Sequence, residues 1–141
     1  MLDLRLSASF AALQWLMIVH VSALVLILMA TEQQQVSVIL AAGVGGNWLW
    51  LRRHPIFGFG PKALRQILWS REQGWQIARA NGVLAEARLL PSSTVLPGLV
   101  VLHFATERGR HRRAVLSADL SEDLFRRLRV RVLDEQAATA A

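Results

Sequence analysis

Hydrophobic residues form two long runs in the first third of the chain and alternate with polar residues in the rest. The first run, 10–30, carries no charge. At about 1.5 Å per residue, a helix of this length spans about 30 Å, the thickness of a bilayer core. The second run, 36–51, reaches only about 24 Å, so it is slightly short unless it borrows length from the glutamines before it, tilts, or thins the bilayer locally. Five polar residues, 31–35, separate the runs, and the pattern predicts a two-span transmembrane helical hairpin within residues 1–53.

Three other interpretations compete with this hairpin. A signal peptide has an apolar segment of about 7–15 residues, whereas the first run is longer and a second run follows it. Core helices of a soluble protein and amphipathic helices lying in the membrane plane both need a polar face. Residues 24–30 offer no polar face, which favours the transmembrane interpretation.

The end of the second run has the order expected of a helix leaving a membrane. Trp48 and Trp50 stand where an aromatic belt belongs, at the headgroup level, and Arg52 and Arg53 lie just beyond it, in water beside the phosphates. Arg5 precedes the first run, and the connecting turn has no basic residue. The positive-inside rule therefore predicts that both termini are cytoplasmic.

Three polar residues, Gln14, His20 and Asn47, interrupt the apolar runs. Gln14 and Asn47 should lie at similar depths in an antiparallel hairpin, so we expect their amides to hydrogen-bond. His20 fits either a hydrogen bond within the hairpin or a proton relay, and neither run offers the acidic partner of a relay. Small residues at 41–46 permit close helix packing, either within the chain or against a second copy in a homo-oligomer.

The remaining chain predicts a small antiparallel β domain, 62–134, so the fold class is an α+β membrane protein. Pro and Gly punctuate 54–61, which we interpret as a linker. Asn81-Gly82 is a strong hairpin signal. Apolar residues at every fourth position predict a C-terminal helix over about 120–133. Residues 135–141 are polar and repetitive, which predicts a disordered tail. The segments expected to form strands are 63–69, 75–80, 83–90, 99–106 and 111–118.

Charge divides the chain in the same way. The formal net charge is +6, yet residues 1–51 hold one base and two acids, while 52–141 hold 15 bases and 8 acids. Lys62 is the single lysine and there is no cysteine. The lack of cysteine excludes disulfides, thiol nucleophiles and zinc thiolate sites.

Arginine clusters are the remaining candidate sites. No histidines show metal-ligand spacing and no catalytic motif is present, so we expect neither a metal, a cofactor nor an enzyme activity. The basic side chains suit an acidic protein or anionic membrane lipids. Nucleic acid is disfavoured, because no aromatic residues are interleaved with the bases. The candidate partner- or lipid-binding residues are Arg108, Arg110, Arg112, Arg113, Arg126 and Arg127.

The order of these parts resembles the YgfX family of bacterial inner-membrane proteins, also called CptA. The resemblance covers most of the chain, apart from the 54–62 segment and the tail. The residues that carry it are Gln14-Trp15-Leu16 with His20, Gly74-Trp75-Gln76-Ile77, Ser92-Ser93 before Val100-Val101-Leu102, and Ala118-Asp119-Leu120-Ser121 leading into Phe125-Arg126-Arg127-Leu128-Arg129.

The resemblance implies a non-enzymatic membrane protein that acts by binding. Members are described as the toxin half of a type IV-like toxin–antitoxin pair, acting on the cytoskeletal polymers of cell division and shape. Their partner is a small soluble protein that is also the flavinylation factor of succinate dehydrogenase. The alternative interpretation is an anionic-lipid-binding or assembly subunit of a membrane complex.

Overall fold

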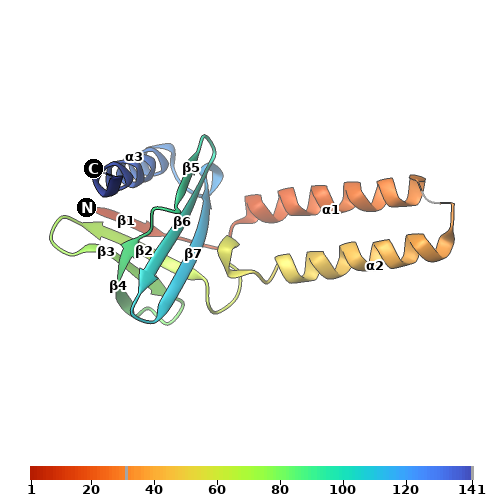
Figure 1. Cartoon of the computed structure of the whole chain (residues 1–141), viewed down its shortest axis with the longest axis horizontal. Coiled ribbons are helices and arrows are strands. Elements are labelled where there is room, and N and C mark those ends of the chain that lie inside the picture. The colour runs from red at the N-terminus through yellow and green to blue at the C-terminus, as the bar shows by residue number, and fades with distance from the viewer. Residues whose placement is uncertain (31, 141) are drawn as a thin grey trace.

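Two long helices project from one end of an α+β domain in the computed structural model (Figure 1), which describes residues 1–30 and 32–140. Helix α1 (Phe10–Ala30) coincides with the first predicted span and has a mean hydropathy of 2.2. Among the described helices, it is the one long and apolar enough to cross a membrane.

Helix α2 (Gln34–Leu51) runs antiparallel to α1 and completes the hairpin in space (Figure 1). It starts before the predicted span, since Gln34 and Gln35 join the helix. These glutamines and Asn47 lower its hydropathy, and α2 does not have the composition of a membrane span. A two-span hairpin is therefore not confirmed by composition. The predicted turn includes Thr31, which lies outside the described residues.

Seven strands form one antiparallel sheet in the order β1-β2-β3-β4-β6-β5, with β7 pairing on β6. The turn at Asn81-Gly82 joins β3 to β4 as predicted, and Gly82 has a φ of 71°. The strands are β1 (Leu2–Arg5), β2 (Leu64–Ser70), β3 (Gly74–Arg79), β4 (Leu84–Leu89), β5 (Thr94–Leu96), β6 (Leu99–Thr106) and β7 (Gly109–Leu116).

Strand β1 was not expected, because the sequence analysis assigned residues 1–53 to the hairpin. Its register on β2 runs from Leu2 opposite Trp69 to Arg5 opposite Gln66. Leu2 and Leu4 are buried while Asp3 and Arg5 are not, which is the alternation of an edge strand. The chain therefore starts in the sheet, leaves it for the hairpin and returns at β2.

The C-terminal helix α3 (Glu122–Ala140) is longer than expected. Residues 135–140, predicted to be a disordered tail, form its last turns, while Ala141 lies outside the described residues. Alanine, glutamate and glutamine are strong helix formers. Gln136 also donates a hydrogen bond to the carbonyl of Ser93. The prediction of a disordered tail is wrong for these residues.

Helix α3 covers one face of the sheet and contacts β1 and β5. Leu128 and Val132 are fully buried, and Phe125 is 6% exposed. Leu133, on the same helix, is 48% exposed. The core that α3 closes consists mainly of Leu4, Leu64, Ile67, Val100, Leu102, Phe104 and Val115.

The predicted linker, 54–61, is held against the domain. Its first half forms the short 3-10 helix η1 (Pro55–Phe57), and Gly58 is buried. The backbone N–H of Ser9 donates to the carbonyl of Phe57 at 3.0 Å. The two ends of the hairpin are thus tied to each other at the domain surface.

Candidate functional site

The arginines predicted from 108–113 do not form one surface. Arg108 lies in the β6–β7 turn, and Arg110 and Arg112 are exposed on β7. Because side chains two apart on a strand share a face, Arg110 and Arg112 lie together. Arg112 pairs in register with His103 on β6.

Two histidines, one on β6 and one on β7, favour the neutral form. Burial and, to a smaller extent, the charge of Arg112 lower the pKa of His103 below its usual 6.5. Burial and the charge of Arg79 lower the pKa of His111 in the same way. An Nη2–Nδ1 distance of 3.2 Å separates Arg79 from His111, and Ser92 lies 2.8 Å from Nδ1 of His103.

Arg113 was predicted to be a surface residue, which is wrong, since only 1% of it is exposed. Alternation along β7 turns it to the opposite face from Arg112. Nη2 of Arg113 donates to the carbonyl of Ser7, and its guanidinium lies directly against Gly58. Burial lowers the pKa of Arg113 to about 10, the charge of Asp119 opposes this, and that of Arg65 adds to it. Arg113 therefore joins the hairpin to the sheet.

Asp119 completes this junction. Its Oδ1 accepts a hydrogen bond from Oγ of Ser9 at 2.8 Å, and its Oδ2 accepts one from the backbone N–H of Leu116 at 3.2 Å. Oγ of Ser9 accepts in turn from the N–H of Ala12 at 3.1 Å, which caps the start of α1. Asp119 belongs to the segment that carries the family resemblance, and its position gives that segment a structural role.

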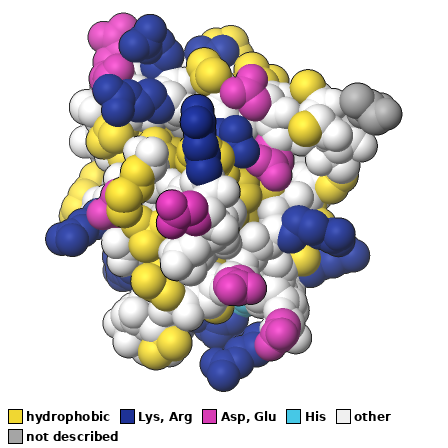
Figure 2. All heavy atoms as spheres, turned by 90° about the vertical axis from the view of Figure 1, so that its left-hand side faces the viewer, with side chains coloured by type: hydrophobic (Ala, Val, Ile, Leu, Met, Phe, Trp, Pro, Cys, Tyr) yellow, Lys and Arg dark blue, Asp and Glu magenta, His cyan; other side chains and the backbone are white. Residues whose placement is uncertain are grey.

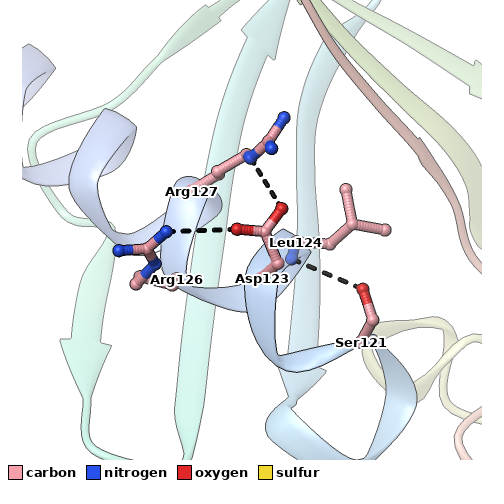
Figure 3. Close-up of polar contacts among 5 residues, drawn as sticks. All are labelled: Ser121, Asp123, Leu124, Arg126 and Arg127. Atoms are coloured by element: carbon pink, nitrogen blue, oxygen red, sulfur yellow. Dashed lines mark hydrogen bonds and ion pairs between the residues drawn. The ribbon is translucent and has the colours of Figure 1, made fainter.

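Arg126 and Arg127 lie on the first turns of α3 and share one carboxylate (Figure 3). Asp123 accepts from Nη2 of Arg126 at 3.2 Å and pairs with Nε of Arg127 at 2.8 Å. The hydrogen bond from Arg126, supported by the charge of Arg127, lowers the pKa of Asp123. All three side chains are at least half exposed, so these pairs contribute little to stability.

The polar residues of the hairpin meet differently from the prediction. The amide of Asn47 lies 3.2 Å from Nε2 of His20, and Nδ1 of His20 lies 2.6 Å from the carbonyl of Leu16. The expected partner of Asn47 was Gln14, which is wrong, because the packing of the two helices brings His20 rather than Gln14 to the Asn47 amide. Both ring nitrogens of His20 thus lie within hydrogen-bonding distance of groups inside the hairpin.

The predicted interface residues lie at the end of α2 nearest the domain (Figure 1). Trp50 is 62% exposed, and its ring centroid is 5.0 Å from that of His54. The ring of Trp48 meets His20 edge-on at 5.4 Å. Arg52 and Arg53 follow as exposed side chains.

A groove that sequence reasoning missed lies between α3, β1 and the β2–β3 turn. Its volume is about 460 Å³, and it brings Trp69 and Arg71 beside Val130 and Arg131 of α3. The guanidinium carbon of Arg131 lies 3.7 Å from the centre of the Trp69 ring, a cation–π contact. The signal was hidden because β1 was not recognised and Arg71 stood alone in a turn.

No group of three or more His, Cys, Asp or Glu side chains is placed to hold a metal ion within residues 1–30 and 32–140. The charged clusters described above consist mainly of arginine side chains. What the arrangement offers chemically is guanidinium donors for carboxylate or phosphate groups.

A model of one protein family matches residues 1–136, nearly the whole chain, and its description is the membrane-bound toxin component of a toxin–antitoxin system. The chain belongs to this family. No curated protein and no solved structure matches the chain. The family agrees with the resemblance seen in the sequence and with α1, the one described helix that is long and apolar enough to cross a membrane. A toxin of such a pair has an antitoxin as its partner.

Proposed function

We propose that this family member is a two-span protein of the bacterial inner membrane with both termini in the cytoplasm. The pairing of β1 with β2 carries the proposal. Strand β1 precedes α1 and β2 follows α2, and paired strands lie on one side of a membrane. If α1 crosses the bilayer, the chain must therefore return through α2. The bases at Arg5, Arg52 and Arg53 support a cytoplasmic location for that side.

The β domain then acts as a binding module without catalysis. Its exposed arginines, Arg110 and Arg112 on β7 and Arg126 and Arg127 on α3, present guanidinium groups to the cytoplasm. Such groups form bidentate pairs with carboxylates of a protein partner. By resemblance, the partners are the small soluble antitoxin that also serves as a flavinylation factor, and the polymers of division and cell shape.

Affinity capture of the full chain from mild detergent tests this function. We expect a small soluble flavinylation factor or a division polymer to co-purify, and we expect Arg110→Glu/Arg112→Glu or Arg126→Glu/Arg127→Glu to reduce its yield. A Lys62→Glu/Arg88→Glu variant makes the same change in net charge at exposed positions outside β7 and α3, and serves as the control. Capture that neither double substitution reduces would reject the arginine surfaces, and absence of any such partner would reject the function.

A second candidate function is binding of anionic lipid. Arg5, Arg65 and Arg79 line a shallow hollow of about 420 Å³, and Arg5 lies just before α1. Juxtamembrane bases gain about 1 kcal/mol each from anionic lipid. This function predicts that the purified full chain retains phosphatidylglycerol over phosphatidylethanolamine, and that Arg5→Glu/Arg65→Glu abolishes the preference. An equal preference for phosphatidylglycerol in the unaltered chain and in Arg5→Glu/Arg65→Glu would reject this function.

A further inference from the structure

The groove between α3, β1 and the β2–β3 turn, here called the distal groove, lies at the end of the domain opposite the hairpin (Figure 1). Figure 2 views the molecule from that end, where basic and acidic side chains stand among hydrophobic ones. A bilayer around α1 would lie at the other end. The distal groove is therefore turned toward soluble molecules and away from the headgroups of its own membrane.

The floor of the distal groove is apolar. Leu2 and Trp69 line it from the sheet, and Val130 lines it from α3. Val130 is 53% exposed, although it lies on the same helix as the buried Leu128 and Val132. The volume of about 460 Å³ is in the range of pockets that enclose a ligand. One or two apolar side chains of a partner would fill it.

The rim of the distal groove is basic. Arg71, Arg126, Arg127 and Arg131 line it, against one lining carboxylate, Asp134. Asp123 forms ion pairs with Arg126 and Arg127. Oε2 of Glu135 pairs with Nη2 of Arg131 at 2.8 Å. Within the described part of the chain, Arg71 takes no ion pair. Basic charge thus remains in excess at the rim, and the exposed pairs can exchange partners at little cost.

We propose that the distal groove docks an acidic segment of a soluble partner protein. An apolar side chain of the segment sits on Val130 beside the Trp69 ring, one face of which Arg131 covers, and its carboxylates pair with Arg71 and Arg127. Charge complementarity and the position away from the membrane favour a protein over lipid. This inference rests on the proposed binding function and names the surface that carries it.

Asp123 occupies two of the rim arginines in the free protein (Figure 3). An incoming carboxylate competes with it for Arg126 and Arg127. Replacing Asp123 by asparagine removes the competitor and keeps the shape. Docking should therefore tighten in Asp123→Asn, which is the opposite direction from the loss expected on removing an arginine.

The test uses the full chain in nanodiscs of neutral lipid and a fluorescent helical peptide with leucines on one face and glutamates elsewhere. We expect Val130→Glu and Arg71→Glu to weaken binding about tenfold, as when an interface anchor is lost. Leu133→Glu is the matched control, since it makes the same charge change at an exposed position of α3 outside the groove. A peptide with glutamine in place of glutamate should also bind about tenfold more weakly.

Equal losses of peptide affinity in Val130→Glu and Leu133→Glu would mean that net charge alone attracts the peptide. That result would overturn the distal groove as the docking site. Absence of binding to the unaltered chain would also overturn it. Affinity capture separates this failure from failure of the function: a partner that Val130→Glu still captures, and Arg110→Glu/Arg112→Glu loses, leaves the function standing on another surface.

Discussion

Arg113 places a charge inside the protein at the point where the hairpin meets the sheet. Its Nε and Nη1 find no hydrogen-bond partner among the described residues, and the guanidinium is held by one carbonyl, by Gly58 and by the nearby charge of Asp119. A buried charge with few partners tolerates little displacement. The geometry of the junction should therefore depend strongly on the residues that surround this side chain.

Gly58→Ala should disturb the junction more than any nearby glycine substitution. Gly58 has a φ of 88°, and an added methyl group would overlap the guanidinium of Arg113. Backbone strain and overlap together should lower the stability of the domain by about 2 kcal/mol or more. Gly60→Ala is the control, because its φ is 80° but the nearest atom to its Cβ is 3.5 Å away. Equal shifts of the thermal unfolding midpoint would contradict the role of Arg113.

Acid should weaken the β domain through its histidines. The folded pKa values of His103 and His111 lie below 6.5, so between the folded and unfolded values the unfolded chain binds more protons. Stability should fall as pH drops below about 6.5, and His103→Gln/His111→Gln should flatten the dependence. Urea midpoints measured across this window test the sign. Asp123 acts at lower pH, because its folded pKa lies below 3.8.

At the scale of elements, α3 closes the core with few residues. Leu128 is fully buried and Leu133 is 48% exposed on the same helix. Leu128→Ala should reduce the free energy of unfolding by about 2–5 kcal/mol, because a buried leucine leaves a cavity. Leu133→Ala should cost well under half as much. Urea unfolding in a mild detergent, followed by near-ultraviolet circular dichroism, measures both, and similar losses would contradict this packing.

Elements with strong local signals were predictable from the sequence. The run 10–30 became α1 to the residue, and Asn81-Gly82 gave the β3–β4 turn. Strand β1 was not predictable, since four residues stabilise a strand only through their pairing with β2, more than 60 positions away. Length of α3 was underestimated, because its last turns are fixed by contacts such as that between Gln136 and Ser93.

The residues of the candidate site were likewise predictable where the signal was local and not where distant contacts decide. Exposure of Arg110, Arg112, Arg126 and Arg127 could be predicted from charge alone. Burial of Arg113 could not, because it depends on β7 facing Ser7 and Gly58, which are distant in the sequence. The distal groove was also hidden, since its walls come from three separate elements.

On the scale of the whole molecule, the route of the chain can be measured directly. The chain has no cysteine, so a single introduced cysteine reports its own location. Gln33→Cys, just before α2, should react with a membrane-impermeant maleimide added to cells with a permeabilised outer membrane. Ser121→Cys should react only after the inner membrane is opened. Protection of Gln33→Cys from the outside reagent, or reaction of Ser121→Cys, would contradict the two-span route.

Strand β1 is made before the hairpin, yet its partner β2 is made after it. During synthesis, β1 therefore has no strand to pair with until both helices and β2 have left the ribosome. The domain therefore cannot mature ahead of the hairpin, and a chain whose second helix fails to return would separate β1 from β2 and leave the core without Leu2 and Leu4. If the chain follows the proposed two-span route, completion of the sheet requires both helices to be inserted, so only a correctly inserted chain buries Leu2 and Leu4 in the core.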